Sequence, residues 1–439
     1  MKMKLLTLLI ILFAAGAVQA QETDGTDGTY KKRVLESTEV DFLMGYYSQD
    51  GDNAAVTGGK GTEDLLDIAP TFIVSVPLNE DDVLTVEAGI SAYTSASSSN
   101  VNPFDGSKPA DPFQASSGAS SSDVWMHGAG TYSHSSDDRN QIWTGKLSLS
   151  SEFDYFSLGF GGSYTRLFNE KNTELSLSGN IFLDQWSKII PYELRSFESG
   201  GSGLNSPLFH QYQITGNTDY SPKFDGLDGK NRNSYSAGIV LTQILSKRMQ
   251  AAFLADWVLQ KGLLSTPFQR VYFSDYEDSF IENFHLADDV ERLPDSRMKI
   301  ALGARLNYYL NERVVFRTFY RYYTDDWGIN SHTASIEMPI KLGNKFTVYP
   351  SYRYYTQTAA DYFAGYNQHL SKEQYYTSDY DLSEFNANQY GIGLRYTDVF
   401  TEHHIWKLKI KSLDLKYHYY ERNSGFKANL ISFGIGFVL

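Results

Sequence analysis

The sequence predicts an all-β fold: a transmembrane antiparallel up-and-down β-barrel of about sixteen strands, with long extracellular loops and short periplasmic turns. Three observations predict it. Apolar and polar residues alternate along many segments, the connections between these segments alternate between long and short, and the chain ends on an amphipathic segment. A bilayer offers the backbone no hydrogen-bond partners, so half-polar segments can cross it only by pairing into a closed ring. We therefore expect the protein in the cell outer membrane, surrounded by outer-membrane lipids.

Residues 1–20 have the features of a cleaved signal peptide. Lys2 and Lys4 precede an apolar run over 5–15, and small residues follow near position 20. The apolar run is too short to cross a bilayer as a helix. A retained helical anchor is the alternative, but nothing after Gln21 extends the run. The predicted division is a signal peptide at 1–20, a short periplasmic N-terminal segment at 21–37 and the barrel at 38–439.

Composition restricts the function classes. Acidic residues outnumber basic ones by 52 to 38, which gives a formal net charge of −14. A nucleic-acid-binding protein needs a basic face, so no nucleic-acid partner is expected. The 32 tyrosines suit a membrane interface, because each has an apolar ring and a polar tip. With no cysteine in the sequence, neither a disulfide framework nor a cysteine-linked lipid anchor is expected.

The period of two is clear over 84–92, where Leu84, Val86 and Ile90 alternate with polar or small residues. One face of such a segment suits lipid and the other suits water. Most of these segments have about the ten residues that a tilted strand needs to cross the hydrocarbon. Strands are predicted at 38–47, 67–77, 83–93, 122–133, 141–151, 154–166, 173–184, 233–245, 248–258, 297–310, 313–324, 332–342, 345–356, 387–398, 404–419 and 427–439.

The lengths of the connections favour this barrel over a soluble β-sandwich. Every long connection follows an odd-numbered strand, and every connection after an even-numbered strand is short. Barrels of the outer membrane have this asymmetry, whereas a sandwich has no reason to sort its loops by parity. The long connection at 259–296 is unusually apolar. We expect it to fold either into the lumen, as a constriction or partial plug, or on itself as a surface cap.

The last strand carries a predicted assembly signal. Phe433, Ile435 and Phe437 lie on one face, and glycines lie on the other. Gly434, Phe437 and Leu439 occupy the positions that the barrel-assembly machinery reads, so this machinery is an expected partner. The terminal Leu439 departs from the commoner phenylalanine.

Three stretches resemble an uncharacterised family, domain of unknown function thirty-five-seventy, and the resemblance covers the whole mature chain. They are Asp50-Gly51-Asp52-Asn53-Ala54-Ala55-Val56-Thr57-Gly58-Gly59, Ser133-His134-Ser135-Ser136-Asp137-Asp138-Arg139-Asn140, and Asp325-Asp326-Trp327-Gly328-Ile329-Asn330-Ser331-His332-Thr333-Ala334-Ser335. The resemblance implies an outer-membrane-type barrel and no known activity. By association alone, it also implies a link to envelope redox or maturation traffic.

A basic wall is the candidate functional feature. Charges on the lipid face would cost about 2–4 kcal/mol each near the midplane, so the basic residues of the later strands must face the lumen. The apolar positions change parity between Ile410 and Leu413, so we expect a bulge near Ser412. The wall is either an anion-favouring passage or a ladder that pairs with acidic loop residues and fills the lumen. Its predicted members are Arg297, Lys299, Arg305, Arg317, Arg321, Arg353, Arg395, Lys407, Lys409, Lys411 and Lys416, faced by Glu337 and Asp414.

The sequence gives weaker signals for a metal site, a hydrolase site and a sugar-binding site. Asp50, Asp52, Glu63 and Asp64 could bind Ca²⁺, but they lack the later positions of a calcium loop, and solvated acidic loops are the simpler interpretation. His134 lies among serines and aspartates, as in a hydrolase triad, but sequence proximity does not establish such geometry. No catalytic, cofactor-binding or metal-binding residue is assigned. Trp143, Trp257, Trp327 and Trp406 are interpreted as interfacial girdles, with sugar stacking as the alternative.

These observations favour a porin-like passage for small, anionic solutes. The alternative is a closed barrel that docks an unidentified periplasmic partner of an envelope redox or maturation pathway. A membrane-embedded lipid hydrolase is the third hypothesis. We predict that the protein is not an enzyme and uses no cofactor.

Overall fold

The computed structural model describes residues 32–95, 123–398 and 400–439. Sixteen antiparallel strands close into one barrel, which confirms the predicted fold class. The strands of the first half are β1 (Glu39–Asp50), β2 (Leu65–Pro77), β3 (Asp82–Ser95), β4 (Asp123–Ser135), β5 (Gln141–Ser151), β6 (Tyr155–Phe168), β7 (Thr173–Trp186) and β9 (Asn231–Ser246). Those of the second half are β10 (Met249–Gly262), β15 (Ser296–Tyr309), β16 (Val315–Asp325), β17 (Asn330–Glu337) with β18 (Ile340–Lys341), β19 (Phe346–Val348) with β20 (Ser351–Gln357), β21 (Phe385–Thr397), β23 (Leu408–Arg422) and β24 (Lys427–Val438).

Two strands of the barrel are interrupted at prolines. Pro339 separates β17 from β18, and Pro350 separates β19 from β20. A proline has no backbone N–H to give to the ladder. The two interruptions face each other, because the backbone N–H of Met338 donates to the carbonyl of Pro350 at 2.9 Å. The ladder continues past them on both sides, since β17 pairs with β20 and β18 pairs with β19.

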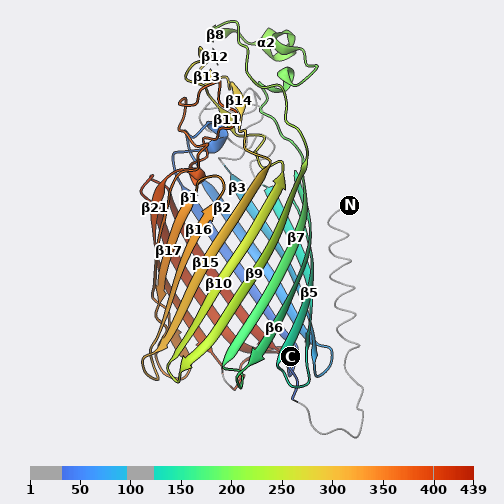
Figure 1. Ribbon diagram of the computed structural model, residues 1–439, viewed down its shortest axis with the longest axis vertical. Helices are drawn as coiled ribbons and strands as arrows, with labels where there is room; N and C mark the ends of the chain where they lie inside the picture. The colour runs from blue at the N-terminus through green and yellow to red at the C-terminus, as the bar shows by residue number, and fades with distance from the viewer. Residues whose placement is uncertain (1–31, 96–122, 399) are drawn as a thin grey trace.

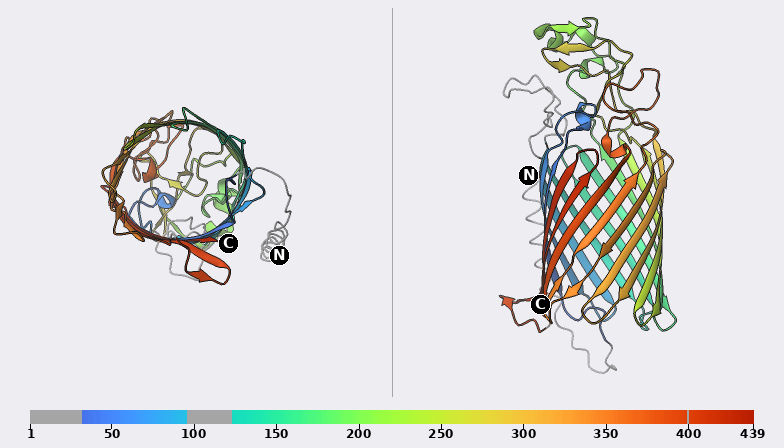
Figure 2. Two further views of the ribbon diagram at one scale, coloured as in Figure 1. Left: turned by 90° about the horizontal axis from the view of Figure 1, so that it is seen from below. Right: turned by 90° about the vertical axis from the view of Figure 1, so that its left-hand side faces the viewer.

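The ring closes between the first and last strands. β1 pairs with β2 on one side and with β24 on the other, from Glu39 opposite Val438 to Asp50 opposite Lys427. No unpaired edge of the barrel is left, as the end-on view in Figure 2 shows. Closure therefore satisfies the backbone groups that a strand edge would leave exposed.

Side chains on the two faces of this wall differ in kind. Phe72, Leu147 and Phe253 are among many large apolar side chains that point outward and are more than half exposed. The residues that alternate with them are mostly Ser, Thr, Gly, Asn and charged residues, and they point inward. A barrel of this kind presents an apolar belt outside and a polar lumen inside.

The two ends of the barrel differ in the length of their connections (Figure 1). At one end, the turn end, short connections at 78–81, 136–140, 169–172, 247–248, 310–314 and 342–345 join the strands. At the other, the loop end, lie the long connections at 51–64, 187–230, 263–295 and 358–384. The predicted strand at 404–419 begins too early. His404–Ile405 form a separate short strand, β22, which folds back on Leu408 and Lys409 at the turn end.

The long connections at 187–230, 263–295 and 358–384 pack together above the barrel, and we call them the loop cap (Figure 1). Their elements are η2 (Arg195–Phe197), η3 (Gly203–Asn205), α2 (Pro207–Gln211), β8 (Ile214–Gly216), β11 (Arg270–Val271), β12 (Ser279–Ile281), β13 (Phe284–His285), β14 (Asp289–Val290) and η4 (Tyr380–Leu382). A further short helix, η1 (Ala55–Thr57), lies in the loop at 51–64. Among the described residues, no helix is long and apolar enough to cross a membrane.

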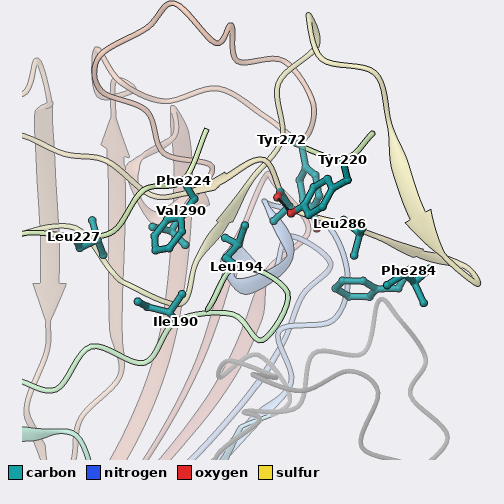
Figure 3. Close-up of a cluster of buried hydrophobic side chains, with 11 residues drawn as sticks. Ile190, Leu194, Tyr220, Phe224, Leu227, Tyr272, Phe284, Leu286 and Val290 are labelled. Carbon is teal, nitrogen blue, oxygen red and sulfur yellow. Dashed lines mark hydrogen bonds between the residues drawn. The ribbon is translucent and has the colours of Figure 1, made fainter. Parts of the chain in front are cut away.

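The loop cap has its own apolar core (Figure 3). Leu194, Tyr220 and Phe224 of one loop pack against Tyr272, Leu286 and others of the next. The buried pair Arg270–Glu193 adds a bond between Nε and Oε1 of 2.6 Å, and Arg270 also donates to the carbonyl of Val56. Of the two open interpretations of 259–296, the structure therefore has the surface cap.

Replacing Glu193 with Ala should loosen the loop cap. It leaves the Arg270 charge buried without its partner, which typically costs about 3–5 kcal/mol. Hydrogen exchange of the backbone amides at 187–230 should speed up accordingly. The matched control is Asp225→Ala, which removes an exposed partner of Arg292 and should change exchange little. Equal effects of the two variants would contradict the assigned role of the buried pair.

Candidate functional site

The later strands of the barrel carry the basic wall on their inner face. On β15, Ile300, Leu302 and Leu306 are exposed on the outer surface, so the alternating residues face the lumen. The strand register carries this alternation to the neighbouring strands, since Arg305 lies opposite Phe319 and Ser335 lies opposite Arg353. Eight predicted residues take inward positions: Arg297, Lys299 and Arg305 on β15, Arg317 and Arg321 on β16, Arg353 on β20, Arg395 on β21 and Lys416 on β23.

A groove in this wall brings three arginines together. Arg305, Arg317 and Arg353 line it, and Glu337 provides its one carboxylate. Arg317 donates from Nη1 to Oε1 of Glu337 at 2.9 Å, and the Arg305 guanidinium lies 5.9 Å from the centre of the Phe319 ring. The groove is also lined by Asn307, Thr318, Phe319, Ser335, Ile336, Ser351, Tyr352 and Gln389. Three guanidinium groups against one carboxylate leave a net positive charge, and their planar forks suit carboxylate and phosphate groups.

Other members of the wall are paired with acids of the wall itself. Arg297 binds Asp325 with 2.5 Å between Nη2 and Oδ2, and its guanidinium lies 4.3 Å from the Trp327 ring. Arg395 binds Asp414 at 2.6 Å between Nε and Oδ1. The acids in these pairs belong to strands, whereas the ladder hypothesis placed them on loops. Within the described chain, no ion pair of Arg305, Arg321, Arg353, Lys299 or Lys416 is found.

Three predicted lysines lie where β23 leaves the barrel. The register between β23 and β24 shifts between Ile410 and Ser412, and this is the bulge that the parity change predicts. Lys411 sits at the shift and reaches Glu39 with 2.7 Å between Nζ and Oε1. Lys407 was expected in the lumen, but it lies in the turn between β22 and β23, off the barrel wall. Lys409 pairs with His404 of β22 on one side and with Val438 of β24 on the other, so it stays in the barrel ladder at the rim. The position of Lys407 departs from the prediction, because the strand that was expected to start at 404 folds into a hairpin there.

An acidic group faces the basic wall, and sequence reasoning missed it. On β2, Ile68 and Phe72 are exposed on the outer surface, so the alternating residues, which include Asp67, point inward. Glu87 of β3 pairs with Ile73, which has the same parity as Asp67, so Glu87 also points inward. In the closed order of strands, β2 and β3 stand half-way round the ring from β15 and β16. Asp67 accepts a hydrogen bond from Ser91, and Glu87 contacts His127 at 3.2 Å. Each acid is flanked by apolar residues in its strand. The sequence could have revealed them only by combining their inward parity with the position of their strands in the ring.

His134 contacts Asp82, with 2.6 Å between Nδ1 and Oδ1, on the outer face beside Trp143. The hydroxyl of Ser136 donates to Asp138 instead, so the triad geometry is not formed there. Within the described residues, no group of three or more His, Asp or Glu side chains could hold a metal ion.

The tryptophans do not form a single girdle. Trp143 and Trp257 are exposed on the outer wall, as predicted for an interface. Trp327 is buried beneath the loop cap against Leu264 and Leu293, so its girdle assignment is wrong. The turn after β16 brings the Trp327 ring to 4.3 Å from the Arg297 guanidinium, a contact that the sequence alone does not show.

The predicted assembly signal lies in β24 at the closing seam. Gly434 stands opposite Leu43 of β1, Phe437 stands opposite Val40, and Leu439 donates its N–H to the carbonyl of Thr38 at 3.0 Å. Its recognition by the assembly machinery stays a prediction.

Four carboxyl groups at the loop end have raised pKa values; Asp288 and Glu291 are buried, and Glu63 and Asp379 are partly buried. Burial is the main cause that raises the pKa of Glu63 to about 7, of Asp288 to about 7, of Glu291 to about 8 and of Asp379 to about 6. Glu291 accepts hydrogen bonds from the Thr266 N–H and the Thr377 hydroxyl, which oppose the rise. These carboxyl groups therefore bind protons more tightly than exposed carboxyls do.

Comparison with known proteins adds the family. The family model described as "Protein of unknown function (DUF3570)" matches residues 8–430. The chain belongs to this family. No curated protein matches its sequence.

Solved structures with a similar arrangement include a bacterial polysaccharide outer membrane secretin, at 11% identity and a TM-score of 0.46, covering 92% of this chain and 99% of that one. Another is a BenF-like porin from Pseudomonas fluorescens, at 8% identity and a TM-score of 0.40, covering 92% and 98%. OpdK from Pseudomonas aeruginosa, solved with vanillate, has 8% identity and a TM-score of 0.35, covering 92% and 99%. At these identities and scores the resemblance gives no information about a solute.

Stability of the loop cap should fall as the pH rises. The three cap carboxyls, Asp288, Glu291 and Asp379, bind protons more tightly in the packed cap than when exposed. The stability of the cap is therefore greatest below the ordinary carboxyl pKa and declines as the pH rises through the folded values, from about 6 to about 8. Hydrogen exchange of the cap amides, corrected for intrinsic rates, should be faster at pH 8.5 than at pH 5.5. Glu291→Gln should reduce this dependence, while Glu277→Gln, at an exposed site in the same loop, should not. A flat profile in the unmodified protein would contradict the explanation.

Proposed function

We propose that this chain is an outer-membrane β-barrel that forms a porin-like passage for small anionic solutes. Its turn end would face the periplasm and its loop end the exterior. The observation that carries the proposal is the groove of Arg305, Arg317 and Arg353 on the inner wall. These residues face the lumen of a closed barrel of sixteen strands, a size that can hold an aqueous channel.

The charge pattern across the lumen supports this assignment. The groove has an excess of guanidinium groups, while Asp67 and Glu87 stand on strands across the ring. Fixed charges of opposite sign on facing walls create a field across the passage, and a low-dielectric wall strengthens it. A small anion would follow the basic side, and a ring of basic side chains gives selectivity when the path is hydrated.

The loop cap favours a second candidate. Its apolar core and the buried Arg270–Glu193 pair show a packed body over the barrel mouth. A barrel closed in this way would serve as a scaffold for an envelope partner, as in the redox or maturation hypothesis. The third hypothesis, an embedded lipid hydrolase, is not supported at His134. Within the described residues, His134 contacts Asp82 while Ser136 donates to Asp138, so these groups do not form a hydrogen-bonded triad.

Ion current through the purified barrel in planar bilayers tests the passage. The unmodified protein should conduct and prefer chloride to potassium in a salt gradient. The double variant Arg305→Glu with Arg353→Glu reverses two charges of the groove, so its reversal potential should change sign. Lys146→Glu is the matched control, because Lys146 faces the lumen from β5, away from the groove. It should shift the reversal potential much less.

The same assay distinguishes the effect of the loop cap on the current from that of the passage itself. Glu193→Ala should raise the open probability if the packed cap restricts the mouth. A folded barrel that carries no current either with or without this substitution would contradict the passage and support the closed scaffold.

A further inference from the structure

The hairpin between β21 and β23 leaves the barrel at the turn end. β21 stops pairing with β23 at Thr397 opposite Ser412, and the bulge at Lys411 redirects the chain. Beyond it, Lys409 and Ile410 still pair with β24 on one side, while Leu408 and Lys409 pair with β22 on the other. Figure 2 shows this hairpin projecting sideways from the barrel, level with the lower ends of the strands. We call residues 400–409 the wing.

Specific bonds hold the wing in this direction. Asp398, buried at its base, donates its backbone N–H to the carbonyl of Lys411 at 3.0 Å. Its Oδ2 lies 2.9 Å from Nδ1 of His403 and accepts from the His403 backbone N–H at 3.2 Å. On the other side, Lys345 of the neighbouring turn lies 3.8 Å from Glu402. Contacts at both sides of its base indicate a built feature of the fold.

The tip of the wing is apolar and exposed. Trp406 is 92% exposed, Phe400 is 77% exposed and Ile405 is 52% exposed. Lys407 and Lys409 flank this tip, and no ion pair of either is found in the part of the chain that the structure describes. Exposing such side chains to water is unfavourable in proportion to their apolar area. Tryptophan beside lysine is the side-chain combination that suits a membrane interface, where the ring enters the headgroup layer and the ammonium stays with phosphate.

We propose that the wing inserts into the headgroup layer of the periplasmic phospholipid leaflet, with Ile405 and Trp406 among the lipids and Lys407 and Lys409 on lipid phosphates. The proposal rests on the membrane placement in the proposed function and is independent of solute passage. The direction of the wing supports this placement, because a hairpin that extends sideways at the lower rim of the apolar belt runs along the membrane surface.

Depth measurements in vesicles test the wing directly. The chain has no cysteine, so Ile405→Cys gives a single site for a nitroxide label. Glu312→Cys is the matched control, in an exposed turn at the same end of the barrel. Both are reconstituted as full-length barrels in phosphatidylethanolamine–phosphatidylglycerol vesicles, with folding checked by heat-modifiable electrophoretic mobility. Collisions with oxygen report lipid, and collisions with a nickel chelate report water.

The label at position 405 should show a several-fold higher oxygen-to-nickel collision ratio than the label at position 312. Equal ratios would overturn the proposal and leave the wing in water, as a periplasmic protein partner would require. Adding Lys407→Glu and Lys409→Glu should lower the ratio at 405 in the same vesicles. An unchanged ratio would overturn the role of the lysines. The collision ratios do not depend on whether the barrel conducts ions. Failure of the wing proposal and failure of the passage proposal are therefore distinguishable.

Discussion

The structure depends on pairing every strand edge, and the seam between β1 and β24 completes that pairing. A chain whose strands are polar on one side has only one arrangement that satisfies its backbone in a solvent without hydrogen-bond donors or acceptors. Closure then fixes what every side chain faces, because the side-chain period is two. A charge on one parity of β15 must face the lumen, and an apolar residue on the other must face outward. The basic wall is thus a consequence of closure and register.

Closure also decides which charges meet. Arg305 and Arg353 lie on strands separated by two others in the ring, yet they line one groove. Asp67 is far from them in sequence and stands across the ring. The inner surface therefore places acids across the ring from the groove, and several basic residues are neutralised locally by acids of neighbouring strands. Where the parity fails, at Lys411, β23 stops pairing with β21, and the wing begins on that side.

Most of the barrel could be predicted from the sequence because strand patterning is local. Each of the sixteen predicted ranges overlaps a barrel strand, and the bulge near Ser412 follows from a change of parity within a few residues. The loop cap could not be predicted in this way, because its contacts join distant segments, such as Glu193 with Arg270. The burial of Trp327 depends on the same packing. Lys407 was misplaced because a hairpin and a continued strand have similar residue patterns there.

The central claim is that the face carrying the arginine groove borders water that is continuous with the bulk solution. The absence of cysteine in the sequence allows a scan along β15 with a charged thiol reagent that cannot cross lipid. In vesicles, Gly303→Cys and Asn307→Cys should react, whereas Leu302→Cys and Leu306→Cys should not. Reactivity that alternates along the strand is the predicted result. Silence at both inward positions in a folded barrel would contradict a hydrated lumen, and reaction at the outward positions would contradict the register itself.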